Sequence, residues 1–300
     1  MGEVVPVGPG WAPVAAVVLV AVTAVTATAD GALAGRPGRV WSEVARLLRQ
    51  QRRTTAAADT LLGRGAVWAA PVVALLMAAV VPLGSWTVAD LGVGVVWFNA
   101  LDVVVWAVFW LAGWGANSAV ALVGGYRFLA QALAYELPLM FALAAPALGA
   151  GSLRLGEVVA AQQRLWFIVW MPAAFLIFCV GVLGFTARGP FAAAAGPDVA
   201  GGLTAELSGV DRLLLAAGRW LLLVAGSAFG VSVFLGGGAG PLLPGWLWVL
   251  VKTVVVALAL LAVARRLPVW RAERFTEVGW LVLLPIALVQ LLVVAVVEVG

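Results

Sequence analysis

The sequence predicts an all-α integral membrane protein with about eight transmembrane helices, organised as a single polytopic membrane domain over residues 1–300. Three observations lead to this fold class. Hydrophobic residues make up 64% of the chain and charged residues 11%, whereas a soluble domain carries roughly 25% charged residues. Apolar runs that reach the length of about 20 residues needed to cross a bilayer recur along the whole sequence. These runs do not alternate between apolar and polar residues as the strands of a membrane β-barrel do.

Eight apolar segments are predicted to span the membrane. The first follows an N-terminus without basic residues, so we expect a retained span and not a cleaved signal peptide. The predicted spans cover approximately residues 11–29, 65–83, 91–112, 128–149, 166–187, 212–235, 246–264 and 278–298.

Residues 40–53, between the first two spans, have the pattern of a short amphipathic surface helix. Val40, Val44, Leu47 and Leu48 fall on one face, and the arginines point elsewhere. Such a helix lies along a membrane surface. Two interpretations stay open for it: anchoring by positive charge alone, or docking of a partner.

The arginines predict the orientation of the chain. They concentrate in the connections that follow the first, fifth and seventh spans, including a loop near residues 188–211. Because loops rich in Lys and Arg stay in the cytoplasm, we expect these loops to be cytoplasmic and both termini to lie outside the cell membrane. The arginines are spread between spans, so they do not indicate a nucleic-acid partner.

The residue types exclude several cofactors. The chain has no histidine and one cysteine, Cys179, within an apolar run. No cluster can therefore hold zinc or an iron–sulfur centre, and histidine cannot ligate haem. Nucleotide-binding glycine motifs are also missing from the sequence. We expect no metal and no cofactor on this chain.

Ionisable side chains inside spans are costly, by about 2.5–3.5 kcal/mol each at a helix centre, and therefore indicate function. The deep candidates are Asp102, Glu136 and Lys252. A carboxyl group in a partly hydrated membrane site can take up and release a proton, so Glu136 is predicted to belong to a proton path. Pro138 frees a backbone carbonyl close to it, and we expect such carbonyls to line a hydrated path. The structural alternative is one interhelical hydrogen bond.

Several motifs, in their order and spacing, resemble the membrane-arm family known as subunit 1 of respiratory complex I, the H-type subunit of NADH:quinone oxidoreductase. The motifs are Gly113-Trp114-Gly115-Ala116-Asn117-Ser118, Gly125-Tyr126-Arg127, Ala130-Gln131, Tyr135-Glu136-Leu137-Pro138, Arg188-Gly189-Pro190-Phe191, residues 205–209 (AELSG), Gly279-Trp280 and Leu284-Pro285. The resemblance is good over about residues 113–290.

The resemblance implies a membrane subunit that contributes to a quinone site and couples electron transfer to proton translocation. NADH, FMN and iron–sulfur clusters would then belong to partner subunits, both membrane and peripheral, and quinone would be the substrate at a shared site. Glu136, Asp198 and Glu206 fall on carboxylate positions of the family, and with Asp102 and Lys252 they are the proton-path candidates. Arg127, Gln131, Arg188 and Phe191 are the candidates for the quinone site and its loop.

The loop departs from the family pattern in a way that leaves other functions open. Residues 192–195 are all alanine where the family carries an acidic cluster. This favours a divergent copy or a relative in a partial complex, such as the membrane subunit of a formate hydrogenlyase or another energy-converting hydrogenase. An independent secondary transporter is the third interpretation, although the sequence has no clear internal repeat.

Overall fold

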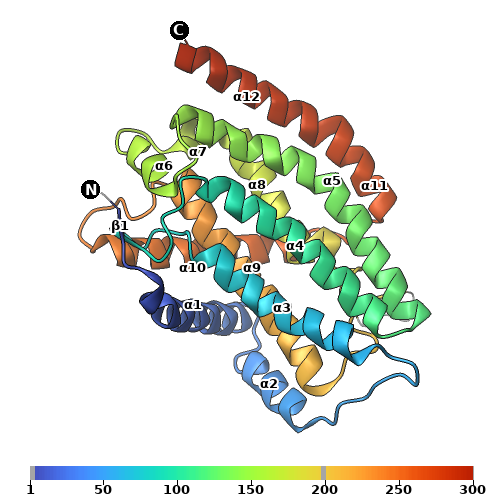
Figure 1. The fold of residues 1–300 in the computed structure, drawn as a ribbon. Helices are drawn as coiled ribbons and strands as arrows, with labels where there is room; N and C mark the ends of the chain where they lie inside the picture. Colours follow the sequence, from blue (N-terminus) through green and yellow to red (C-terminus); the bar gives the residue numbers. More distant parts are fainter. Residues whose placement is uncertain (1–3, 197–200, 300) are drawn as a thin grey trace.

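The computed structural model describes residues 4–196 and 201–299, and these form a bundle of long helices (Figure 1). Within them, eight helices are long and apolar enough to cross a membrane, which confirms the predicted fold class. These spans are Pro9–Leu33, Thr60–Ala78, Gly94–Gly115, Ala119–Gly149, Pro172–Phe191, Gly209–Phe234, Gly245–Arg266 and Ala272–Glu298.

The named elements follow one another along the chain. The long helices are α1 (Ala12–Leu33), α3 (Thr60–Ala78), α4 (Gly94–Gly115), α5 (Ala119–Gly149), α8 (Pro172–Phe185), α9 (Gly209–Phe234), α10 (Gly245–Arg266) and α12 (Leu284–Val299). Shorter elements connect them: β1 (Val5–Pro6), η1 (Pro9–Trp11), α2 (Arg39–Arg49), β2 (Trp86–Thr87), α6 (Leu155–Ala161), α7 (Phe167–Trp170), η2 (Gly189–Phe191), α11 (Ala272–Val278) and the π-helical segment η3 (Gly279–Leu283). The two short strands pair in parallel.

Several helix boundaries differ from the prediction, and three of these differences have identifiable reasons. Helix α3 begins five residues early because the Asp59 carboxylate accepts a hydrogen bond from the Leu62 backbone N–H and caps the helix. The predicted span 166–187 is broken into α7 and α8 at Pro172, which has no N–H to donate and disfavours helical geometry in the residue before it. Helix α5 begins nine residues before the predicted span, which started after the charged Arg127. The helix includes Arg127, whose guanidinium group donates a hydrogen bond to the Gly201 carbonyl.

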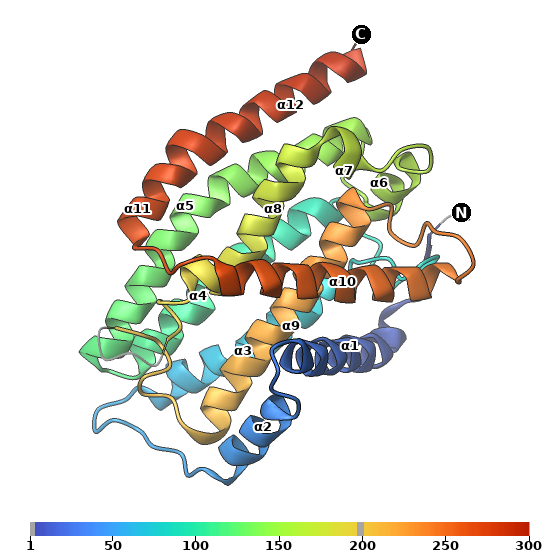
Figure 2. The same ribbon diagram turned by 180° about the vertical axis from the view of Figure 1, so that it is seen from behind.

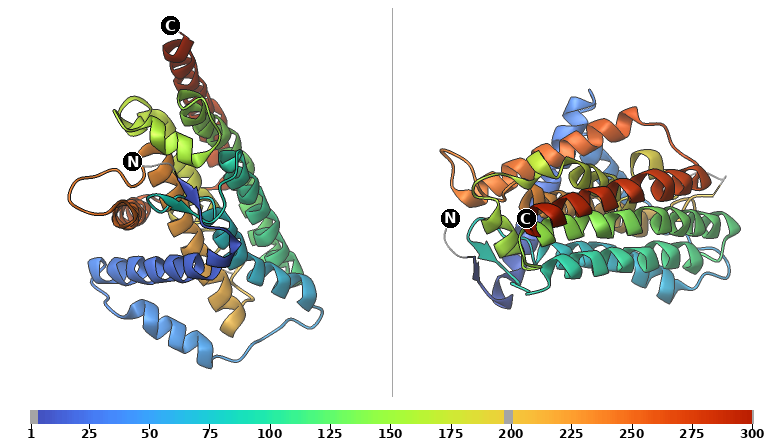
Figure 3. Two further views of the ribbon diagram at one scale, coloured as in Figure 1. Left: turned by 60° about the vertical axis from the view of Figure 1, so that its left-hand side comes forward. Right: turned by 90° about the horizontal axis from the view of Figure 1, so that it is seen from above.

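The long helices form two sets that cross. Helices α12, α5, α4 and α3 lie side by side in one layer, as the right panel of Figure 3 shows, and neighbours in this layer pack on one another. Helices α1 and α10 run side by side across the opposite face (Figure 2). Helix α9 lies between the two sets and packs against α1, α3, α8 and α10. In the most apolar part of each span, only 22% of the residues are buried in the span of α1 and only 17% in the span of α12. These two spans are therefore the most open to lipid or to partners.

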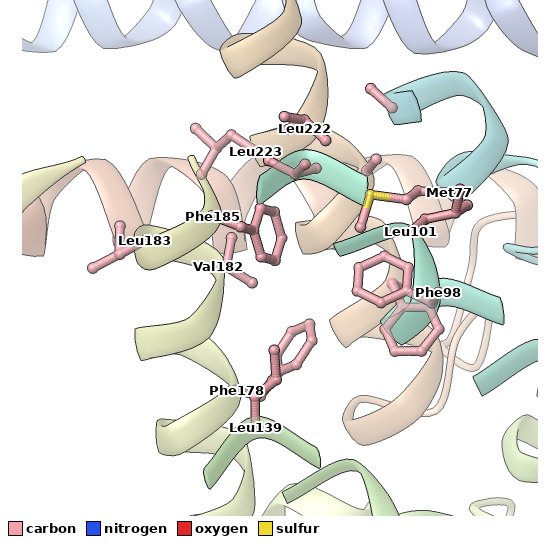
Figure 4. Packing of buried hydrophobic residues seen from close by; sticks show 14 of the residues in the cluster. Met77, Phe98, Leu101, Leu139, Phe178, Val182, Leu183, Phe185, Leu222 and Leu223 are labelled. Atoms are coloured by element: carbon pink, nitrogen blue, oxygen red, sulfur yellow. The ribbon is translucent and has the colours of Figure 1, made fainter. Parts of the chain in front are cut away.

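Aromatic side chains fill the centre of the bundle (Figure 4). Phe98 of α4 stacks on Phe229 of α9 with ring centroids 3.7 Å apart. Phe178 and Phe185 of α8 surround this pair. Gly226 and Gly230 of α9 make room for these rings, because a Cβ there would lie 2.7 Å or less from a Phe185 or Phe178 ring atom. The core therefore joins α4, α8 and α9 in one packed unit.

Helix α2 is the predicted surface helix, and its apolar residues do not all share one environment. Leu47 is buried, and α2 packs on α9, while Leu48 is exposed. A hydrogen bond from Arg46 lowers the pKa of Glu43, so these two charges are paired on the helix itself. The exposed Leu48 leaves an apolar contact for the membrane surface.

We predict that Gly115→Ala destabilises the protein. A Cβ at Gly115 would lie 2.5 Å from the backbone N and Cα of Gly63, where α3 and α4 cross. Such overpacking costs about 1–3 kcal/mol. Thermal unfolding in detergent should show a lower midpoint for this variant. Gly65→Ala is the matched control in α3, because a Cβ there meets nothing within 4 Å; an equal midpoint for the two variants would contradict the prediction.

Candidate functional site

One face of α4 carries polar groups into the interior of the bundle. Asn99, Asp102 and Trp106 are spaced three and four residues apart, so they share that face. The Asp102 side chain has no exposed surface. The polar groups begin one residue after Phe98, which belongs to the aromatic core. A carboxyl group is thus held inside the apolar bundle.

Helix α5 supplies the groups that face this polar stripe. The Asn99 side-chain N–H donates to Glu136 Oε1 over 2.9 Å, and the Tyr135 hydroxyl donates to Asp102 Oδ1 over 3.4 Å. Glu136 is 7% exposed. Sequence reasoning identified Asp102 and Glu136 separately and did not pair them. It missed Asn99, although its position three residues before Asp102 on one helix face was a usable signal.

The two carboxyl groups form a pair. Asp102 of α4 and Glu136 of α5 are neighbours, because Tyr135 donates to Asp102 and Asn99 donates to Glu136 across the same pair of helices. Asp102 Oδ2 and Glu136 Oε2 are buried and have no hydrogen-bond partner among the described residues, and no ion pair in this part of the chain includes either group. Two carboxyl groups this close can hold one proton between them. The arrangement can therefore accept, store and pass on a proton, and we call it the carboxyl pair.

A backbone carbonyl near the carboxyl pair, which we expected to be exposed, is in close contact with another segment. Helix α5 continues through Pro138, which leaves the Ala134 carbonyl without its usual intrahelical donor. Gly279 packs directly on this carbonyl, since a Cβ at Gly279 would lie 2.4 Å from the Ala134 oxygen. The first residue of the π-helical segment therefore covers part of this carbonyl, and the hydrated path stays a prediction.

A cleft opens at the end of the bundle where α3 begins and α4 ends. Its empty volume is about 440 Å³, which includes space open to the surroundings at its mouth. Its walls combine charged, hydroxyl and apolar groups, among them Arg53, Thr55, Arg64, Val67, Ala112, Glu206 and Asp211. Thr55 donates a hydrogen bond to the Ala116 carbonyl and ties the loop before α3 to the end of α4. Sequence reasoning missed this cleft, because its walls come from three separated segments.

Two acids, one in the loop before α9 and one in the first turn of α9, lie beside this cleft. Glu206 accepts a hydrogen bond of 2.7 Å from Ser118, the residue directly before α5. Asp211 lies 3.3 Å from the guanidinium of Arg52. Asp198, the other loop candidate besides Glu206, lies outside the described residues. Arg127 donates to the Gly201 carbonyl over 2.8 Å, and Gln131 is buried with its carbonyl oxygen unpartnered within the described chain.

The other two candidates for the quinone site, Phe191 and Arg188, lie in contact with aromatic side chains away from the cleft. Phe191 is 1% exposed and packs against Tyr135 and Phe275. The Arg188 guanidinium stacks on the Trp220 ring at 4.1 Å. Neither residue lines the cleft described above. Their roles at a quinone site stay predictions.

Lys252 is held by backbone carbonyls and aromatic rings. Its ammonium group donates to the carbonyls of Leu235, Gly237 and Ala239 over 2.7–3.0 Å and lies 4.1 Å from the Trp166 ring. These carbonyls follow the C-terminal end of α9, where a positive charge is favourable. Lys252 therefore stabilises the connection between α9 and α10. The partners of Lys252 include no group of the carboxyl pair.

Comparison with known proteins gives a consistent result. The family model described as NADH dehydrogenase matches residues 38–295. The second of the H-type NADH-quinone oxidoreductase subunits of Geobacter sulfurreducens is 36% identical over 263 residues, which cover 84% of this chain and 80% of that protein. The H-type NADH-quinone oxidoreductase subunit of Geobacillus kaustophilus is 33% identical over 86% of this chain and 79% of its own length.

We predict that Lys252→Met lowers stability because it leaves three carbonyls without their donor. An unmet buried acceptor costs about 1–3 kcal/mol. The thermal midpoint of the purified chain in detergent should fall clearly. Arg266→Met is the matched control, since Arg266 is an exposed cation at the other end of α10. A midpoint that falls no further for Lys252→Met than for the control would show that the carbonyl contacts contribute little.

Proposed function

Because this chain belongs to the NADH dehydrogenase family, with relatives that are membrane subunits of NADH-quinone oxidoreductases, we propose that it couples electron transfer to proton translocation in a complex of that kind. In this proposal the chain contributes to the quinone site and provides part of the proton path. Electrons reach quinone from NADH through FMN and iron–sulfur clusters on partner subunits.

The carboxyl pair is the observation that carries the proposal. An uncompensated charge inside a bilayer is unfavourable, and Asp102 and Glu136 have no cation beside them in the described chain. A pair that shares a proton avoids two adjacent negative charges and still keeps a second proton-binding position free. This supports a role in which the pair loads and releases one proton when its surroundings change.

The cleft supports a quinone-binding role for the neighbouring segments. A quinone headgroup presents two carbonyl acceptors on an apolar ring. Arg53 and Arg64 can donate hydrogen bonds within the cleft, while Val67 and Ala112 add apolar surface. A ligand pocket that is mostly apolar with a few polar groups suits such a molecule.

One contact links the cleft to the helix that carries Glu136. Glu206 lines the cleft and accepts the hydrogen bond of Ser118, which immediately precedes α5. A change of charge in the cleft would alter this contact at the start of α5. We infer that loop acids act on the carboxyl pair through α5. The proposed orientation places the cleft and the arginine-rich connections in the cytoplasm and both termini outside.

The direct test replaces each carboxyl group by its amide in the assembled complex. Glu136→Gln and Asp102→Asn should lower proton translocation by about tenfold or more, because a proton-transfer group is lost while the shape is kept. The measurement is quinone-dependent proton uptake by sealed vesicles that contain the complex. Glu298→Gln removes an exposed carboxyl group and serves as the control. A ratio of protons to electrons that equals the wild-type ratio in both variants would contradict the proposal.

The partners decide between this function and the alternatives. We expect the tagged chain, purified gently from its native membrane, to bring quinone-reducing and other membrane subunits with it in mass spectrometry. Recovery with a nickel–iron hydrogenase subunit would contradict the quinone proposal and favour the hydrogenase-type complex. A stable, solitary chain that is active alone would favour a transporter.

A further inference from the structure

A second charged cluster lies away from the carboxyl pair, where α1, α9, α10 and η2 meet. It consists of Asp30 of α1, Arg188 before η2, Arg219 and Trp220 of α9, and Arg265 of α10, and we call it the arginine cluster. Asp30 forms an ion pair with Arg265. Asp30 also lies near Arg188, and Arg219 lies near Arg188.

The two inner arginines are fixed in place without a carboxylate of their own. Arg219 donates through Nε to the Thr186 carbonyl over 2.9 Å and through a second nitrogen to the Ala187 carbonyl. Arg188 lies over the Trp220 ring, and its buried Nε has no acceptor among the described residues. None of the ion pairs in the described chain includes Arg188 or Arg219.

The electrostatics of the arginine cluster are unbalanced. Arg219 repels Arg188. Asp30 attracts Arg188, but the Asp30 carboxylate is already paired with Arg265. Like charges held together in partly buried surroundings are unfavourable unless an anion joins them. Planar guanidinium groups bind the oxygens of phosphate in bidentate fashion. The cluster therefore has the positive charge of a phosphate site, and its guanidinium groups are of the type that binds phosphate.

The position of the cluster identifies the source of the phosphate. Asp30 and Arg265 lie within the last turns of α1 and α10, and Arg188 follows the end of α8, so the cluster is level with the ends of three spans. Phospholipid headgroups occupy that level of a bilayer. Leu33, Val263 and Leu267 are exposed apolar side chains at the same helix ends, where acyl chains would lie. We propose that the arginine cluster binds the phosphate of an anionic phospholipid headgroup, whatever redox partners the chain has.

The test measures lipid retention by the full chain reconstituted in bilayer discs of phosphatidylcholine with a minor fraction of phosphatidylglycerol. After extraction into detergent, native mass spectrometry gives the fraction of chains that keep phosphatidylglycerol. Arg188→Gln with Arg219→Gln should reduce this fraction by about tenfold or more, because two charge-assisted contacts are lost. The matched control is Arg36→Gln, an exposed arginine just beyond α1, which should keep the lipid.

Three further outcomes are informative. Equal retention by the double variant and the wild type would overturn the proposal. Protection against thermal unfolding by inorganic phosphate, with no further effect of phosphatidylglycerol, would overturn the lipid as the source. If the double variant does not fold, Arg219→Lys replaces it; retention should fall severalfold because lysine lacks the planar fork, and unchanged retention would contradict the site.

Discussion

Inside a bilayer every polar group must find its partner within the protein, and most of the intramembrane charges in the described residues satisfy this constraint. Lys252 meets three carbonyls, Arg219 meets two, and Arg127 meets one. The carboxyl pair is different, because Asp102 and Glu136 each keep a buried oxygen that has no hydrogen-bond partner within the described chain. In our proposal the two groups share a proton. On this account the fold creates a proton-binding site by leaving two neighbouring acids without a cation.

The aromatic core fixes the distance between the helices that form this site. Phe98 directly precedes Asn99 and stacks on Phe229, so this ring contact between α4 and α9 helps to set the height and rotation of Asp102. On the other side, Tyr135 packs against Phe191 and against Gly184, where a Cβ would lie 2.5 Å from its ring. Movement of the loop that contains Phe191 would therefore reach Tyr135 and the carboxyl pair. In our proposal this contact and the Glu206–Ser118 hydrogen bond are the two routes by which the loop influences α5.

The sequence was sufficient to predict the eight spans, because long apolar runs report membrane burial directly. It was insufficient where a boundary depends on one local contact, as with the Asp59 cap of α3 or the break at Pro172. Intramembrane charge pointed to Asp102, Glu136 and Lys252, with Glu136 favoured for a proton path, but the cost of burial does not reveal a partner. Only packing separates them: Lys252 is surrounded by carbonyls, and the two acids face each other. The cleft could not be predicted from the sequence either, because its walls come from segments far apart in the chain.

The central claim is that the carboxyl pair changes its proton occupancy when the complex turns over. Infrared difference spectroscopy of the assembled complex, recorded between the oxidised and quinol-reduced states, observes protonated carboxyl groups directly. We expect a change in the carboxyl C=O stretching band that is lost in both Asp102→Asn and Glu136→Gln, since the proton belongs to the pair. A band that is unaffected by either substitution would show that the pair keeps its protonation state during turnover, and would contradict the account.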